Sequence, residues 1–169
     1  MSGKTIGLDM NNGFAGSYAR QPDMIINTHA NKEASASIPF GHALMVASGG
    51  VKLPTASITS ADFAGVAARQ VQSQLVYNAQ NGAGEFLPNA PVACFQRGRI
   101  NVECKVGSPA LNGNVYIAIS TANSNVVGDF TATEGTLNTD TIKLTNCKWG
   151  GAKDANNIVE LVILQADNA

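Results

Sequence analysis

The sequence predicts a mainly β protein, built as a small antiparallel β-sandwich or barrel core with an extended N-terminal arm. Composition is the first observation: 44% of the residues are hydrophobic, but only 14% are charged and 6% are aromatic. Asn, Ser, Thr, Gln and 17 glycines must therefore supply the polar surface, and this mixture favours strands and turns over long helices. The second observation is that short apolar runs with a period of two recur between turns rich in Gly and Asn.

The third observation is that residues 1–36 show neither a sustained helical period nor more than brief strand alternation. Glycines and Pro22 interrupt any helix there, so we expect an extended arm before a β-rich core domain at residues 37–169. The arm is nevertheless too apolar for a segment that meets only water. Its large apolar residues are Ile6, Leu8, Met10, Phe14, Tyr18, Met24, Ile25 and Ile26.

These apolar side chains of the arm need a surface against which they can be buried. Two arrangements are open: the arm packs on its own core as a first strand, or it packs on neighbouring subunits, which we favour. Arg20 and Asp23 flank Pro22, and we expect them to fix the arm's register through polar contacts with a neighbouring chain. Together with the apolar set, they are the predicted partner-binding residues.

The core begins with a predicted strand at Ile38–Val46, in which Ile38, Phe40, His42, Leu44 and Val46 share one face. Gly49-Gly50 predicts a turn, and a short extended piece follows at Val51–Leu53. The segment 60–74 is compatible with a helix capped by its first serine or with a strand.

A hairpin is predicted from Val92–Phe95 and Arg99–Val106, joined by a tight Gln96-Arg97-Gly98 connection. In its second strand Cys104 shares a face with apolar residues, so this thiol is expected in the core. Further strands are predicted at Val115–Ile119, Ile142–Leu144 and Ile158–Leu164. Several short strands joined by such turns favour a sandwich or barrel.

Charge and hydropathy argue against several classes of partner. The 11 Lys plus Arg and 12 Asp plus Glu give a net charge of −1, so no broad positive field attracts nucleic acid. No apolar stretch approaches the roughly 20 residues that span a bilayer, and no signal peptide is apparent. We therefore expect neither nucleic-acid nor membrane binding, and synthesis in a cytoplasm.

Groups that could carry catalysis or hold a metal are sparse. The three cysteines, Cys94, Cys104 and Cys147, include no C-x-x-C pair and are expected to be free buried thiols. His29 and His42 have no evident common site, and the acidic residues are scattered singly. The sequence thus predicts no catalytic residue, no metal site and no cofactor. Trp149 and Tyr116 leave open a stacking platform for a sugar ring.

Residues 13–45, GFAGSYARQPDMIINTHANKEASASIPFGHALM, resemble the N-terminal region of the structural cement proteins of tailed phages. In that family a Gly-rich arm with an "AGxxAR.PD.II" character precedes a strand of the form "I.FG.A(V/L)". Later elements are also similar: FAGVA at 63–67, RGRINV at 97–102 and GNVY at 113–116. The resemblance extends over nearly the whole chain.

The resemblance implies a non-enzymatic structural protein of the virion: a capsid decoration protein on the outer surface of a phage head. It implies that the protein ties neighbouring capsid subunits together, with the major capsid protein and copies of itself as partners, often in a homotrimer. It implies no cofactor. The alternative that the residues leave open is a carbohydrate- or receptor-binding β-module of a virion.

Overall fold

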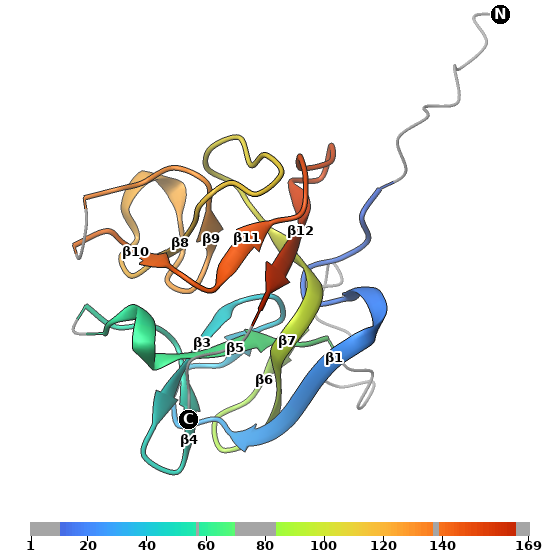
Figure 1. Cartoon of the computed structure of the whole chain (residues 1–169). Coiled ribbons are helices and arrows are strands. Elements are labelled where there is room, and N and C mark those ends of the chain that lie inside the picture. The colour runs from blue at the N-terminus through green and yellow to red at the C-terminus, as the bar shows by residue number, and fades with distance from the viewer. Residues whose placement is uncertain (1–10, 57, 70–83, 137–138, 165–169) are drawn as a thin grey trace, which may run out of the picture.

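Figure 1 shows a computed structural model that describes residues 11–56, 58–69, 84–136 and 139–164. The chain is mainly β with antiparallel sheets, so the predicted fold class is confirmed. In the described part, no helix is both long and apolar enough to cross a membrane. The strands are β1 (Tyr18–Ala30), β2 (Ile38–Pro39), β3 (Ala43–Ala47), β4 (Gly50–Lys52), β5 (Phe63–Ala67), β6 (Glu85–Phe86), β7 (Pro91–Glu103), β8 (Val115–Ala118), β9 (Phe130–Thr131), β10 (Thr141–Leu144), β11 (Cys147–Trp149) and β12 (Ile158–Ile163), with 3-10 turns at Ser60–Asp62 and Ala122–Ser124.

Strand β7 organises the large sheet because it pairs with three other strands. Phe95 of β7 is paired with both β1 and β5, whereas Ile100 is paired with both β1 and β12. Figure 1 shows β7 running between the β8, β9 and β10 side of the molecule and the β3, β4 and β5 side. Both ends of β7 therefore have paired neighbours.

Five strands of this sheet form a closed ring. In sheet order β7, β5, β3 and β4 follow one another, and β1 pairs with β7. An isolated parallel bridge between Asn31 and Val51 then joins β4 to the chain that follows β1. The N–H of Lys32 donates to the carbonyl of Val51 at 2.8 Å. A closed ring of strands corresponds to the barrel that the sequence left open beside the sandwich. Strands within such a ring have neighbours on both sides and present no open sheet edge.

The predicted hairpin at residues 92–106 is wrong, because β7 passes through Gln96-Arg97-Gly98 without turning back. Gly98 has a φ of +113°, which lets the strand bend at low cost. Its neighbours keep it extended: Arg97 and Arg99 have partners on β1, and Gly98 has one on β12. Pairing with distant strands thus overrides a local sequence that resembles a tight turn.

The predicted strand Ile38–Val46 is interrupted between β2 and β3, where Gly41 adopts a φ of +81°. The predicted alternation also fails, since Val46 is 46% exposed whereas Ala43 and Met45 are fully buried. Three consecutive residues at the start of β3 are buried and the last two are not, so burial along the strand does not alternate with a period of two. The turn before β4 is as predicted, and the ambiguous segment 60–74 becomes a 3-10 turn followed by β5 up to residue 67.

The arm predicted at residues 1–36 is partly described. Its residues 18–30 form β1 and pair with β7 of the same chain, which is the first-strand arrangement left open by the sequence. Just before β1, the side-chain amide of Asn12 donates to the carbonyl of Ile158 at 2.9 Å. The N–H of Gly16 donates to the carbonyl of Asn101 at 2.8 Å. Residues 11–30 are therefore fastened to the core, while residues 1–10 lie outside the described part.

A three-stranded sheet, β10-β8-β9, packs beside the ring. The N–H of Ala43 donates to the carbonyl of Gly128 at 2.9 Å, and Nε2 of His42 lies 3.3 Å from Oδ1 of Asp129. These contacts join the start of β3 to the loop before β9. His42 is therefore a structural histidine at the junction of the two sheets. Burial lowers the pKa of His42 and outweighs the opposing effect of the Asp129 carboxylate.

Gly98→Ala tests the bend in β7. A Cβ at this position would lie 2.1 Å from the carbonyl oxygen of Asp23, and a φ of +113° is strained for alanine. We expect the free energy of unfolding to fall by about 2 kcal/mol or more in urea titrations. Gly151→Ala is the matched control, because no described residue other than its chain neighbours lies within 4 Å of the added Cβ. Equal stability of the two variants would contradict the account of β7.

Candidate functional site

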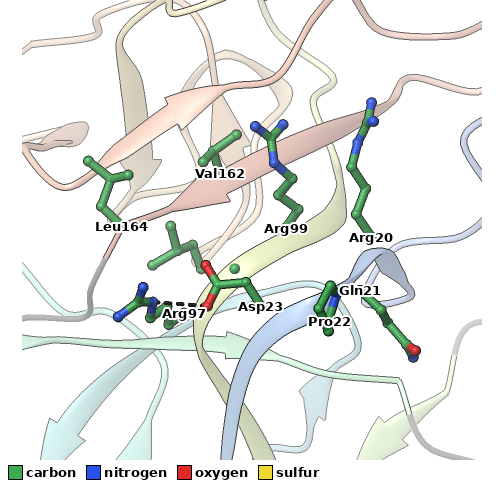
Figure 2. A pocket seen from close by; sticks show the side chains of 10 residues that line it. Arg20, Gln21, Pro22, Asp23, Arg97, Arg99, Val162 and Leu164 are labelled. Carbon is green, nitrogen blue, oxygen red and sulfur yellow. Dashed lines mark ion pairs between the residues drawn. The ribbon is translucent and has the colours of Figure 1, made fainter.

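A groove of about 320 Å³ lies where β1, β7 and the end of β12 meet. Figure 2 shows its lining side chains, with Arg20 and Arg99 on one side, Arg97 and Asp23 on the other, and Val162 and Leu164 beside them. The lining residues are Arg20, Gln21, Pro22, Asp23, Arg97, Gly98, Arg99, Val162, Ile163 and Leu164. The groove thus unites a segment of the predicted arm with two strands of the predicted core.

The register of the sheet places two arginines side by side in the groove. Arg99 of β7 is paired with Arg20 of β1 and with Val162 of β12, so the three side chains form one cross-strand row. Like charges directly opposite each other in a sheet are destabilising. Glu160 resolves this conflict, because it lies two residues before Val162 and therefore on the same face.

Glu160 bridges the two arginines with its two carboxylate oxygens. Oε2 accepts a hydrogen bond from Nε of Arg20 at 2.9 Å, and Oε1 accepts one from Nη1 of Arg99. Burial favours the neutral acid, but the hydrogen bonds and positive charges of Arg20 and Arg99 together keep the pKa of Glu160 below its usual value. The carboxylate stays ionised and holds both guanidinium groups in place.

A bulge in β1 forms the other wall of the groove. Between Arg20 and Ile25, β1 advances five residues while β7 advances two, from Arg99 to Arg97. The extra residues lift Pro22 and Asp23 out of the ladder, and Oδ1 of Asp23 lies 3.2 Å from Nε of Arg97. Figure 2 shows this ion pair at the mouth of the groove. The bulge thus gives Arg97, on the other side of the groove from Arg20 and Arg99, a carboxylate partner.

The groove offers positive charge and aliphatic surface together. Arg20, Arg97 and Arg99 face Asp23 and Glu160, which leaves one net positive charge. The three arginine side chains are 68%, 49% and 43% exposed, respectively. Each guanidinium carries five N–H donors in a planar fork that suits carboxylates. This arrangement can bind an anionic group next to an apolar one.

The structure separates the predicted partner-binding residues into groups. Ile6, Leu8 and Met10 lie outside the described part, and Phe14 is 63% exposed beneath the guanidinium of Arg69, 4.7 Å from its ring centre. Tyr18 stacks on Phe95, and Met24 and Ile26 pack against the core, whereas Ile25 is 47% exposed. Arg20 and Asp23 do make polar contacts, but their described partners belong to the same chain.

Sequence reasoning missed Arg97, Arg99 and Glu160 as members of this site. The two arginines were assigned to a hairpin, and Glu160 sits in the most apolar strand of the chain. One signal was present, because a lone acid inside an apolar strand requires a cationic partner if it is shielded from water. The identity of that partner depends on the pairing of β12 with β7, which sequence alone does not supply.

The other candidate groups are buried structural residues. Cys94, Cys104 and Cys147 are buried, and burial raises the pKa of Cys94 to about 12. The stacking platform that the sequence left open does not form, since Trp149 is 1% exposed and Tyr116 is 6% exposed. Among the described residues no cluster of three or more His, Cys, Asp and Glu could hold a metal ion.

Comparison with known proteins gives a family match and a structural match. The family described as "Structural cement protein (E217 gp24/Pam3 gp6)" matches residues 3–164. A chain in a solved structure titled "The capsid of Myoviridae Phage XM1" has a TM-score of 0.70 at 16% sequence identity. The alignment covers 98% of this chain and 99% of that chain, so the fold is shared over its full length. No curated protein matches the sequence significantly.

The burial of the thiols predicts how they react. Because the pKa of Cys94 is about 12 and that of Cys104 is also raised, little thiolate forms at neutral pH in the folded chain. We expect native protein to react slowly with a thiol reagent, and unfolded protein to show three free groups without reductant. A single free group after unfolding would indicate an intramolecular disulfide and contradict this assignment.

Glu160→Gln tests the carboxylate that bridges the arginines. At neutral pH the variant should be less stable by about 1 kcal/mol, a value kept small because Arg20 and Arg99 are partly exposed. The folded-state pKa of Glu160 is lowered, so its contribution is present above the usual glutamate pKa and is lost as pH falls through the folded value. Unfolding curves of the two proteins should therefore converge on acidification. A constant gap from about pH 7 to pH 3 would overturn this role.

Proposed function

Because the chain belongs to the family of phage structural cement proteins, we propose that it binds the outer surface of a tailed-phage head and ties neighbouring capsid subunits together. The family gives the chain a capsid-associated structural role. The observation that carries the finer proposal is that the family match begins at residue 3, so it includes the arm as well as the core. Its partners are then the major capsid protein and copies of itself.

The arm is proposed as the tether. Ile6, Leu8 and Met10 give its first ten residues the apolar side chains that a partner surface would bury. A fully extended segment of that length reaches roughly 33–36 Å, enough to leave the core and cross onto another subunit. The segment that follows is fastened by Asn12 and by β1, so a load on the arm would pass into β7.

Assembly as a homotrimer on the head is part of the proposal and is implied by the family resemblance. The exposed large apolar residues of the described part are candidates for contacts between subunits. They are Phe14, Ile25, Val46, Leu87, Leu111, Val126 and Leu164. Close packing on a lattice suits a chain whose charged fraction is only 14%. The role is proposed to be non-enzymatic, at the surface of the virion, after synthesis in the host cytoplasm.

The carbohydrate-binding alternative is not favoured. A sugar-binding platform needs exposed aromatic rings, and both of its candidates, Trp149 and Tyr116, are buried. Trp149 belongs to the same apolar core cluster as Phe63 and Phe95. Its ring therefore stabilises the fold and is not available for a ligand.

Deletion of residues 1–10 tests the tether. The deletion stops before Asn12 and β1, so the fold and the unfolding temperature should stay close to those of the full chain. Co-sedimentation with undecorated heads should fall at least tenfold in affinity, because several buried apolar contacts are lost. Normal binding by the truncated protein would reject the tether. Failure of the full-length protein to bind heads would reject the proposed function itself.

A further inference from the structure

We propose that the arginine groove between β1, β7 and β12 binds an extended acidic segment of a neighbouring capsid protein. In this arrangement, one partner carboxylate accepts a hydrogen bond from Arg20 and a second accepts one from Arg97, while the apolar side chains between them rest on Val162 and Leu164. The inference rests on the proposed function, because it names the chemistry of one partner surface. It also adds a second point of attachment that does not depend on residues 1–10.

The charges of the groove support an anionic partner. Glu160 and Asp23 are the carboxylates paired with its arginines in the described part of the chain, and each pair engages one guanidinium nitrogen per arginine. Every guanidinium therefore keeps donors for a further acceptor. Arg20 and Arg97 are 68% and 49% exposed, so a partner can reach them. Hydrogen bonds between arginine and carboxylate are among the stronger polar contacts at interfaces.

The arginines are also held in position before any partner arrives. Arg20 and Arg99 are paired with the two oxygens of Glu160, and Arg97 is paired with Asp23 on the bulge. A long side chain that is already ordered loses less conformational entropy on binding. Glu160 is 14% exposed, so it supports the arginines from beneath and leaves their outer nitrogens to the partner.

The apolar part of the groove favours a protein segment as its occupant and argues against a small anion. Pro22, Val162 and Leu164 line the groove beside the arginines, and Leu164 is 63% exposed. A volume of about 320 Å³ is at the lower end for ligand pockets and accommodates a few side chains. A free phosphate would leave the aliphatic surface exposed, and a net charge of −1 disfavours a nucleic acid strand. An acidic peptide that alternates with apolar residues fits both features.

Three single substitutions in the full-length protein test the groove in a head-binding assay. Arg20→Gln and Arg97→Gln each remove one proposed carboxylate contact, whereas Lys143→Gln removes the same charge from the exposed face of β10. Thermal unfolding checks that each variant is folded. We expect the two arginine variants to co-sediment with undecorated heads about tenfold more weakly, and the lysine control to change less than about twofold.

The outcomes separate the groove from the proposed function. If the wild-type protein binds heads and both arginine variants bind equally well, the groove inference is overturned while the cement role stands. If the wild-type protein does not bind heads, the proposed function fails. If the wild-type protein self-associates in solution and the arginine variants do not, the occupant is a second copy of this chain, which also overturns the inference.

A peptide probe tests the chemistry without heads. We would titrate acetyl-Val-Asp-Val-Asp-Val-amide into labelled protein and follow backbone amide signals by NMR. Signals of Asp23, Gly98 and Arg99 should shift, the shifts should shrink in Arg97→Gln, and the matching peptide with Asn in place of Asp should leave them unchanged. Raised salt should weaken the effect, since the contacts are partly exposed. Equal shifts with the Asn peptide would overturn carboxylate recognition.

Discussion

The backbone pairing of β7 is the constraint on which the rest of the structure depends. This one strand pairs with β1 along most of its length, with β5 near Phe95 and with β12 from Gly98 onward. Because buried backbone groups need hydrogen-bond partners, a change in the path of β7 would leave donors and acceptors unpaired in all three neighbours. Gly98 makes this path possible, since its positive φ bends the strand and its missing Cβ lets the carbonyl of Asp23 approach.

The groove lies beside the same glycine. Opposite Gly98, β1 advances five residues from Arg20 to Ile25 while β7 advances two, and this bulge carries Pro22 and Asp23 out of the ladder. The register of β1 on β7 sets Arg20 opposite Arg99, an arrangement that is tolerated because the carboxylate of Glu160 on β12 pairs with both. Backbone geometry thus gathers charge at one place on a chain that is otherwise poor in charged residues.

The sequence predicted what depends on local pattern and failed where distant pairing decides. The β class and the strands near Val115, Ile142 and Ile158 follow from apolar runs between turn residues. The hairpin at Gln96-Arg97-Gly98 was wrong, because the same glycine that permits a turn also permits a bend. The sequence identified part of the site, because Arg20 and Asp23 were predicted to make polar contacts. Glu160, Arg97 and Arg99 could not be predicted, because only the register of the sheet brings them next to these two residues.

The position of β1 links the two proposed attachment points mechanically. β1 follows residues 1–17 of the arm and forms one wall of the groove at its bulge, and it pairs with β7 in antiparallel register. A pull along β1 acts across hydrogen bonds that lie perpendicular to it, so the bonds share the load. Two weak contacts on one rigid strand also raise each other's effective concentration on a lattice. The proposed cement role would use that combination, because modest contacts with each neighbour would together resist separation of the capsid subunits.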